Sequence, residues 1–164
     1  MAKTEQDLQA AFAGESQANR KYLAFAKKAE QEGYGQIARL FRAAAEAETI
    51  HAHNHLRELG AIKGTRENLA AAISGESYEF QQMYPAMIKD AEAEGNKGAL
   101  RSFTIANEVE KVHAALYQKA LDQFGSNAET DYYVCTVCGH TVEGEPPDTC
   151  PVCGAKKQAF KKVD

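Results

Sequence analysis

The four residues Glu110-Lys111-Val112-His113 lie near the middle of a long segment whose apolar residues recur every three or four positions. The same pattern, a glutamate followed three residues later by a histidine, occurs at Glu48-Thr49-Ile50-His51 in a second such segment. Three residues advance a helix by about 300°, so the two side chains of each pair can reach one point beside the helix. Each pair therefore predicts a place where a helix offers an oxygen and a nitrogen to one metal ion.

The helical pattern extends over most of the first 124 residues. Short breaks that contain glycine divide it into four helices, which we expect at about residues 4–32, 36–59, 65–94 and 97–124. Thr4 and Thr65 are the expected N-caps of the first and third helices. Pro85 should bend the third helix, because proline lacks a backbone N–H donor and crowds the preceding turn. Four long helices with alanine-rich faces predict an all-α four-helix bundle.

The first and third helices each carry a single glutamate at the middle of the apolar face, Glu15 and Glu76. A buried carboxylate loses its hydration at considerable cost, and four at one level of a bundle would also repel one another. These faces carry no Lys or Arg near the glutamates, so a bound cation is the expected compensation. One Glu from each of two helices and a Glu-x-x-His pair from each of the other two form the ligand set of di-iron carboxylate bundles. Carboxylate oxygens with one imidazole per metal suit iron or manganese.

Four further residues lie close to this set. Glu79, one helical turn after the third-helix glutamate, offers another oxygen ligand, with a surface position as the alternative. Tyr22 shares the face of the first-helix glutamate, where it either hydrogen-bonds the site or packs. We expect His55 to be a hydrogen-bonded core or rim histidine and His53 to face solvent.

All four cysteines lie near the C-terminus, in Cys135-Thr136-Val137-Cys138-Gly139 and Cys150-Pro151-Val152-Cys153-Gly154. Two Cys-x-x-Cys-Gly knuckles predict a tetrahedral four-thiolate site for zinc or iron. Their spacing does not separate these metals: zinc would be inert, whereas iron would carry one electron at a time. Disulfides are the alternative, which a reducing compartment disfavours. We place a domain boundary near Ala128, so that residues 1–128 form the bundle and residues 129–164 a small domain that needs its metal to fold.

These features together resemble the rubrerythrin family, in which a ferritin-like di-iron domain precedes a rubredoxin-like domain. The resemblance covers essentially the full chain and rests on the two Glu-x-x-His segments, the two knuckles, Gly14-Glu15-Ser16-Gln17-Ala18-Asn19, Gly75-Glu76-Ser77-Tyr78-Glu79, Met83-Tyr84-Pro85 and Gly144-Glu145-Pro146-Pro147-Asp148. It implies a ferritin-like four-helix bundle followed by a small, metal-stabilised, β-rich rubredoxin-like domain.

The resemblance also implies roles for individual residues. The carboxylate ligands would be Glu15, Glu48, Glu76 and Glu110, with Glu48 and Glu110 bridging two irons, and His113 would be an imidazole ligand. His51 and Glu79 would exchange at one iron as its oxidation state changes. Tyr22 and Tyr84 would lie close to the iron pair and, with Glu79, would be catalytic. A third iron would be held by Cys135, Cys138, Cys150 and Cys153.

The implied activity is the reduction of hydrogen peroxide to water in oxidative-stress defence, a peroxidase of the NADH-dependent type. Electrons would come from an external donor, such as a rubredoxin or an NAD(P)H-dependent reductase, and pass singly through the four-cysteine iron. A ferroxidase or iron-storage protein is the alternative, although storage has no need of an attached electron carrier. A zinc-ribbon binding module on a structural bundle is a third possibility, and it would leave the glutamates idle.

The connection between the second and third helices is short. If these helices lay parallel in one bundle, the chain would have to return about 36 Å along a helix of roughly 24 residues. Residues 61–64 reach at most about 14 Å. The helix ends could unwind, the two helices could pack antiparallel, or the first two helices of one chain could pack with the last two of another. We favour the last arrangement, a domain-swapped homodimer.

The composition excludes other classes of protein. There are 19 Lys and Arg against 23 Asp and Glu, and a net charge of −4 offers no basic surface for nucleic acid. No apolar run approaches the roughly 20 residues that cross a bilayer, and the N-terminus lacks the apolar region of a secretory signal. We therefore expect a cytoplasmic protein with neither a nucleic-acid nor a membrane partner.

Overall fold

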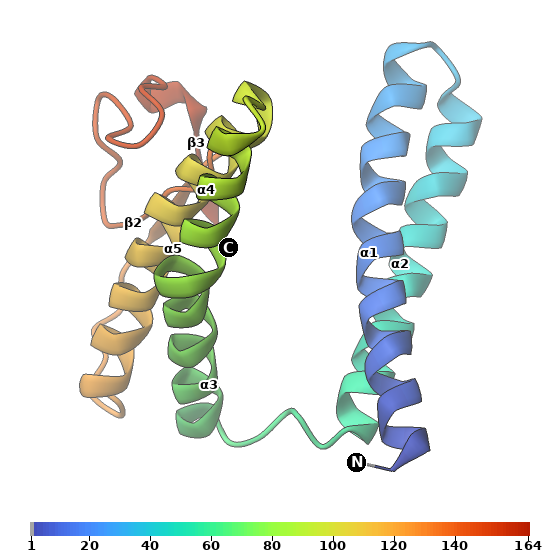
Figure 1. The fold of residues 1–164 in the computed structure, drawn as a ribbon, viewed down its shortest axis with the longest axis horizontal. Coiled ribbons are helices and arrows are strands. Elements are labelled where there is room, and N and C mark those ends of the chain that lie inside the picture. The colour runs from blue at the N-terminus through green and yellow to red at the C-terminus, as the bar shows by residue number, and fades with distance from the viewer. Residues whose placement is uncertain (1) are drawn as a thin grey trace. The chain divides into compact units, whose positions relative to one another are not determined.

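The computed structural model describes residues 2–164, which fall into two compact units divided between Lys63 and Gly64 (Figure 1). The first unit is a hairpin of two helices, α1 (Lys3–Gln31) and α2 (Gly35–Glu58). The second contains the remaining helices and a small sheet. The domain boundary predicted near residue 128 is a different division, between the residues expected to bind the iron pair and those expected to bind the third iron. It stays a prediction. Among the described residues, no helix is both long and apolar enough to cross a bilayer.

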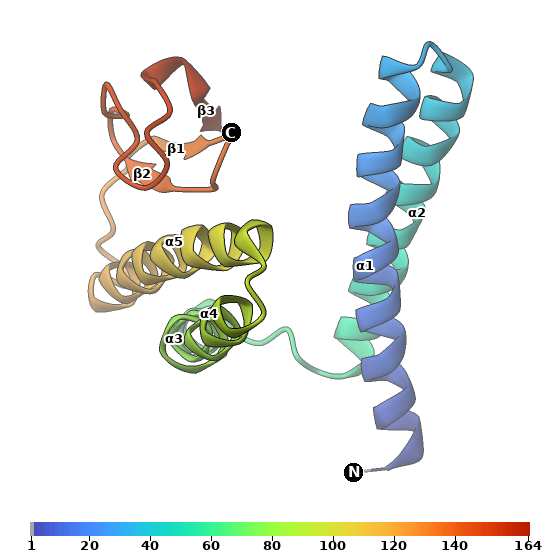
Figure 2. The same ribbon diagram turned by 45° about the horizontal axis from the view of Figure 1, so that its top comes forward.

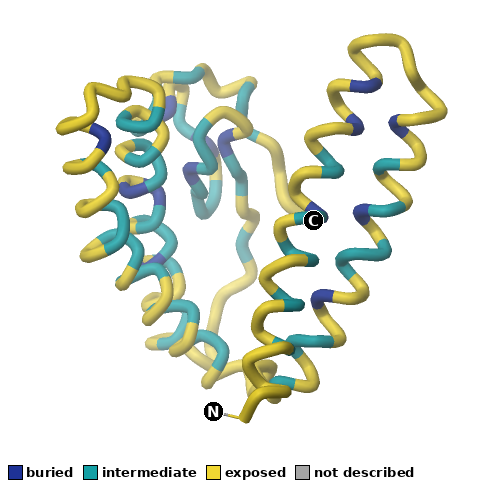
Figure 3. Tube along the Cα trace, turned by 45° about the vertical axis from the view of Figure 1, so that its right-hand side comes forward, coloured by how far each residue is buried: buried dark blue, intermediate teal, exposed yellow. Residues whose placement is uncertain are grey.

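A seam of alanines joins α1 to α2. The most buried residues of this unit are small, with at most 7% of the residue exposed: Asn19, Ala26, Ala29, Ala38, Ala45 and Ala52. The buried positions of the chain are dark blue in Figure 3. Small side chains allow the two helix backbones to approach closely. Larger apolar side chains, such as Phe25 and Leu40, remain exposed in this hairpin. The strip of residues buried between α1 and α2 is therefore narrower than the apolar helix faces that the sequence predicts.

The third predicted helix is one helical run with an irregular turn inside it. It consists of α3 (Thr65–Tyr78), the π-helical turn η1 (Glu79–Met83) and α4 (Tyr84–Ala93). In η1 the backbone N–H of Tyr84 donates to the carbonyl oxygen of Glu79, five residues earlier. A π-turn accommodates one extra residue without ending the helix and is frequent at functional sites. The π-turn ends just before Pro85, which lies in the first turn of α4, and the bend expected at Pro85 stays a prediction.

The last helix, α5 (Lys97–Asp122), packs along α3 and α4. All helix ends lie within about two residues of the prediction, the usual uncertainty of such boundaries. The two expected threonine caps are wrong. Helix α1 begins at Lys3 after Ala2, and α3 begins at Thr65 after Gly64, whose N–H donates to the Glu67 carboxylate at 3.3 Å.

The chain ends in a three-stranded antiparallel sheet of order β2-β1-β3 (Figure 2). Its strands are β1 (Tyr132–Cys135), β2 (Thr141–Glu143) and β3 (Phe160–Val163), and one short helical turn, η2 (Lys157–Ala159), precedes β3. Tyr133 of the central strand is opposite Val142 and Lys162. The deepest side chains of this region are Cys135 and Cys150, each 1% exposed. A region whose core consists largely of thiols depends on what those thiols bind.

Candidate metal centres

The first unit brings together three of the predicted ligands. Glu15 of α1 and Glu48 and His51 of α2 each offer a ligand atom, and these atoms lie within 4.8 Å of one another. His51 Nδ1 is 3.0 Å from Glu48 Oε2. The Glu48 side chain is 18% exposed, whereas that of His51 is 53% exposed. This first half-site is therefore open on one side.

The second unit holds a matching set. Glu76 of α3 and Glu110 and His113 of α5 offer ligand atoms within 4.8 Å of one another. His113 Nδ1 lies 2.7 Å from Glu110 Oε2 and 3.9 Å from Glu76 Oε2. Its other ring nitrogen, Nε2, lies 2.9 Å from Thr141 Oγ1 of β2. In this second half-site, Nδ1 faces the carboxylates and is the nitrogen available to a metal.

The two half-sites repeat one arrangement along the chain. Glu48 follows Glu15 by 33 residues, and Glu110 follows Glu76 by 34. The tyrosines show the same offset, because Tyr22 follows its glutamate by seven residues and Tyr84 follows its own by eight. The turn η1 lies within both of the longer intervals, and a π-turn adds one residue to a helix. The second helix pair is therefore equivalent to the first, with one residue inserted at Glu79.

Several carboxyl groups lie close together in and beside the second half-site. Burial raises the pKa of Glu76 to about 7, helped by its hydrogen bond to Glu110 and by the charges of Glu110 and Glu79. Burial and Glu110 also raise the pKa of Glu79, which His113 partly opposes. Two neighbouring carboxylates with raised pKa values favour the binding of a cation between them. The donor set, carboxylate oxygens with one imidazole, fits iron or manganese.

The predicted catalytic residues lie in different units. Glu79 and Tyr84 border the second half-site: burial raises the Tyr84 pKa, as do the charges of Glu110 and Glu79. The Tyr84 ring packs 6.3 Å from that of Phe103. Tyr22 belongs to the first unit, where it packs among aromatic rings and lies 6.2 Å from Phe41. Both tyrosines are half-buried.

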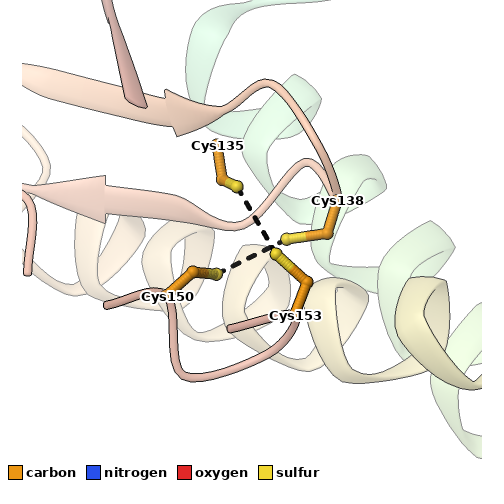
Figure 4. A group of neighbouring side chains, drawn as sticks. All are labelled: Cys135, Cys138, Cys150 and Cys153. Atoms are coloured by element: carbon orange, nitrogen blue, oxygen red, sulfur yellow. Dashed lines mark hydrogen bonds between the residues drawn. The ribbon is translucent and has the colours of Figure 1, made fainter. Parts of the chain in front are cut away.

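The four cysteine sulfurs converge on one point (Figure 4). The Sγ atoms of Cys135 and Cys153 are 3.7 Å apart, and those of Cys138 and Cys150 are 3.6 Å apart. A disulfide would place two sulfurs about 2.05 Å apart. Four sulfurs that bind one ion tetrahedrally at about 2.3 Å are about 3.8 Å from each other. The observed spacing is that of a metal site, and the four thiols are free.

Both knuckles use one hydrogen-bond pattern. The N–H of Gly139 donates to the Cys135 carbonyl at 2.8 Å, and the N–H of Gly154 donates to the Cys150 carbonyl at 2.9 Å. Both glycines have positive φ, 85° and 76°, a conformation that residues with a Cβ rarely adopt. Burial alone would raise the pKa of Cys135, but hydrogen bonds from the backbone N–H groups of Val137 and Cys138 and from the Cys138 and Cys153 side chains outweigh it and lower that pKa. Burial raises the pKa of Cys138 in the same knuckle, so without a metal the knuckle favours the thiolate at Cys135 only.

Two residues beside the first knuckle escaped the sequence analysis. Thr141 bonds His113 as described, and His140 is 9% exposed, with its ring edge-on to Phe160. Burial and the nearby His113 lower the pKa of His140. Neither residue belongs to a spacing pattern, so only their position after the knuckle could have drawn attention to them.

Known proteins resemble this chain along nearly its whole length. A family model described as rubrerythrin matches residues 7–121, and one described as the rubredoxin-like domain of rubrerythrin matches residues 133–161. Rubrerythrin-2 of Clostridium acetobutylicum is 40% identical, with 98% of this chain and 96% of that protein covered. Nigerythrin of Nitratidesulfovibrio vulgaris is 37% identical, with 98% and 86% covered.

Solved structures of nigerythrin are similar to this chain in fold. Nigerythrin in its partially reduced state and in its fully reduced, all-ferrous state matches with a TM-score of 0.61 in each case. Each is 36% identical, and the match covers 99% of this chain and 88% of the solved one. These matches confirm the predicted fold class, a ferritin-like helical region followed by a small rubredoxin-like region.

Proposed function

Because the chain belongs to the rubrerythrin family, we propose that it reduces hydrogen peroxide to water at a di-iron site. The family consists of di-iron proteins of oxidative-stress defence, and its members are oxidoreductases with peroxidase-type activity. The cofactors are two iron ions in the carboxylate and histidine site and one iron ion in the four-cysteine site. Each peroxide takes up two electrons and two protons and yields two water molecules.

One observation carries this proposal. The second unit holds both a two-glutamate, one-histidine half-site and a four-cysteine site within a single compact body. When bound, an iron pair at the carboxylates would offer two electrons to one O–O bond, and an iron at the four cysteines would return them one at a time. A ferroxidase or an iron store would use the carboxylates but would leave the cysteine site without a task.

We propose ligand roles in line with this chemistry. The iron pair would be held by Glu15, Glu48, Glu76, Glu110 and His113, with Glu48 and Glu110 bridging. His51 and Glu79 would alternate at one iron, and the π-turn supports this role because it sets Glu79 at an irregular point of the helix. The phenol of Tyr84 stays protonated beside the carboxylates, so its O–H can donate to a substrate oxygen. Tyr22, its equivalent on α1, would do the same from the other half-site.

We further propose that the two half-sites of one iron pair come from two chains. Helix α2 has 24 residues and spans about 36 Å. The connection of residues 59–64 reaches about 20 Å, too little to return along α2 to a parallel α3. Exposed apolar side chains on α1 and α2, such as Phe25 and Ile37, support a partner helix pair on that hairpin. Family members are generally oligomeric, and the proposed domain-swapped homodimer agrees with this.

A long flexible insertion after Ile62 tests the exchange. It would allow one chain to supply both helix pairs, so the dimer should give way to a monomer with the iron content per chain unchanged. The same oligomeric state before and after insertion would contradict the exchange.

We place the protein in the cytoplasm, where four free thiols stay reduced, and expect an external donor to supply its electrons. A rubredoxin or an NAD(P)H-dependent reductase is the proposed donor, as in a peroxidase of the NADH-dependent type. The acidic net charge of −4 gives no reason to expect nucleic acid as a partner.

The activity is tested by mixing. The iron-loaded protein is reduced without oxygen and mixed either with peroxide or with oxygenated buffer. Rapid return of the red thiolate-to-iron absorption with peroxide, and slower return with oxygen, is expected. A faster reaction with oxygen together with growth of a ferric mineral would support a ferroxidase instead. A colourless protein that contains only zinc would contradict the electron-transfer role.

A further inference from the structure

The second half-site and the first cysteine knuckle are in direct hydrogen-bond contact. His113 and Thr141 are 28 residues apart in the chain, yet Nε2 of the imidazole lies 2.9 Å from the threonine Oγ1. A histidine that gives one nitrogen to a metal carries its proton on the other, and a hydrogen bond to that N–H fixes the ring. With Nδ1, which faces Glu110 and Glu76, bound to a metal, Nε2–H would donate and Thr141 Oγ1 would accept.

The threonine hydroxyl continues toward the cysteines. Its O–H donates to the carbonyl oxygen of Gly139 at 3.2 Å. Gly139 directly follows Cys138, whose sulfur belongs to the four-cysteine group. Two hydrogen bonds and a short run of covalent bonds therefore connect the Cys138 sulfur to the His113 ring.

Packing holds this contact in place. A Cβ on Gly139 would lie 3.9 Å from Cγ1 of Val109, which is 3% exposed on α5. Lys119 of α5 forms an ion pair with Glu143 at the other end of β2. The first knuckle therefore lies against α5 near Val109, and the end of β2 is paired with α5 through Lys119. Thr141 lies between these two places in the chain.

We propose that Thr141 is a positioning residue that orients His113 and joins the four-cysteine site to the half-site of its own chain for electron transfer. This inference rests on the proposed peroxidase function. In each transfer the iron held by the four cysteines would give up one electron and the iron pair would take it up, while the protons of Thr141 and His113 stay in place. Two such transfers follow each peroxide, and the external reductant replaces both electrons.

Two substitutions separate the hydroxyl from the shape of the side chain. Thr141→Val keeps the branched shape and removes the hydrogen bond, whereas Thr141→Ser keeps the hydroxyl. In the reduced, iron-loaded protein mixed with peroxide, Thr141→Val should slow the return of the red absorption by about ten-fold, the lower range for loss of a partner of a metal-bound histidine. The rate at which peroxide oxidises the iron pair is measured in each variant, because Thr141 also orients an iron ligand, and the return of colour should be slowed more than this rate in Thr141→Val. Thr141→Ser should restore the return of colour.

A second readout needs no turnover. In the zinc-loaded, ¹⁵N-labelled protein, the Nε2–H proton of His113 should exchange slowly with water in the wild type and in Thr141→Ser, and rapidly in Thr141→Val. The mixing experiment described above also needs a control. Protein with zinc in place of the iron pair and iron in the cysteine site gives the rate at which peroxide oxidises the cysteine-bound iron directly.

The outcomes are distinguishable. Absence of any reaction of the wild-type iron pair with peroxide would contradict the proposed function. A normal reaction of that pair, with colour returning in Thr141→Val at the wild-type rate, would overturn only the role of Thr141. Unchanged proton exchange in Thr141→Val would overturn the hydrogen bond itself.

Discussion

Glu76 on α3 and Glu110 on α5 share a hydrogen bond, and burial together with this bond raises the pKa of Glu76 from 4.5 to about 7. Between these two values the folded protein holds a proton that the unfolded chain has lost. The stability of the metal-free protein should therefore fall as the pH rises from about 4.5 to about 7. A bound cation compensates the carboxylates and should remove this dependence.

Thermal unfolding of the metal-free helices, followed by far-ultraviolet circular dichroism across this pH range, measures the effect. Glu76→Gln should flatten the profile, because glutamine cannot ionise. Glu92→Gln, at an exposed position on α4, should leave the profile as in the wild type. A wild-type stability that rises over this range would contradict the raised pKa.

Glu79 should matter more for peroxide turnover than for iron content, because His51 would hold the same iron in its place. It borders the second half-site but does not belong to the three-residue group. Glu79→Ala should lower the rate of peroxide turnover by about ten-fold or more and leave the iron content nearly unchanged. The matched control is Glu92→Ala in the same helical run, which should have no effect. Equal turnover in both variants would favour a ferroxidase over a peroxidase.

The alanine seam should not tolerate larger side chains. Ala38 is fully buried between α1 and α2, and Ala38→Leu should lower the free energy of unfolding by about 1–3 kcal/mol. Ala43, exposed on the same helix, provides the control, because Ala43→Leu should change it by less than about 0.5 kcal/mol. Urea unfolding of the metal-loaded protein measures both. A cost as large at Ala43 would show that leucine itself, and not the seam, is responsible.

The sheet should depend on its metal. Cys150→Ser removes one thiolate from a buried cluster, so the red absorption and the protection of amide protons in residues 132–163 should both be lost. The helices should persist, because their cores lie elsewhere. Thr149→Ser, next to it, should keep both signals. Persistent amide protection in Cys150→Ser would mean that the sheet folds without the metal.

Local patterns in the sequence determined much of this protein. Helix ends, the two Glu-x-x-His pairs and the two cysteine knuckles depend on spacings within a few residues, so they can be recognised from the chain alone. The one-residue difference between the glutamate spacings was also present in the sequence. The cause of this difference could not be read from the sequence, because helical periodicity does not show where a helical turn widens. The structure shows that the extra residue lies in η1, which begins at Glu79.

Only the tertiary structure decided which residues meet across the chain. It grouped the helix ligands into two sets of three, one in each compact unit, and it joined α1 to α2 through alanines and not through the larger side chains. It also brought Thr141 to His113. A hydroxyl on a short strand carries no periodic signal, and its partner is set by how the sheet packs on α5, so no local pattern could have predicted this contact.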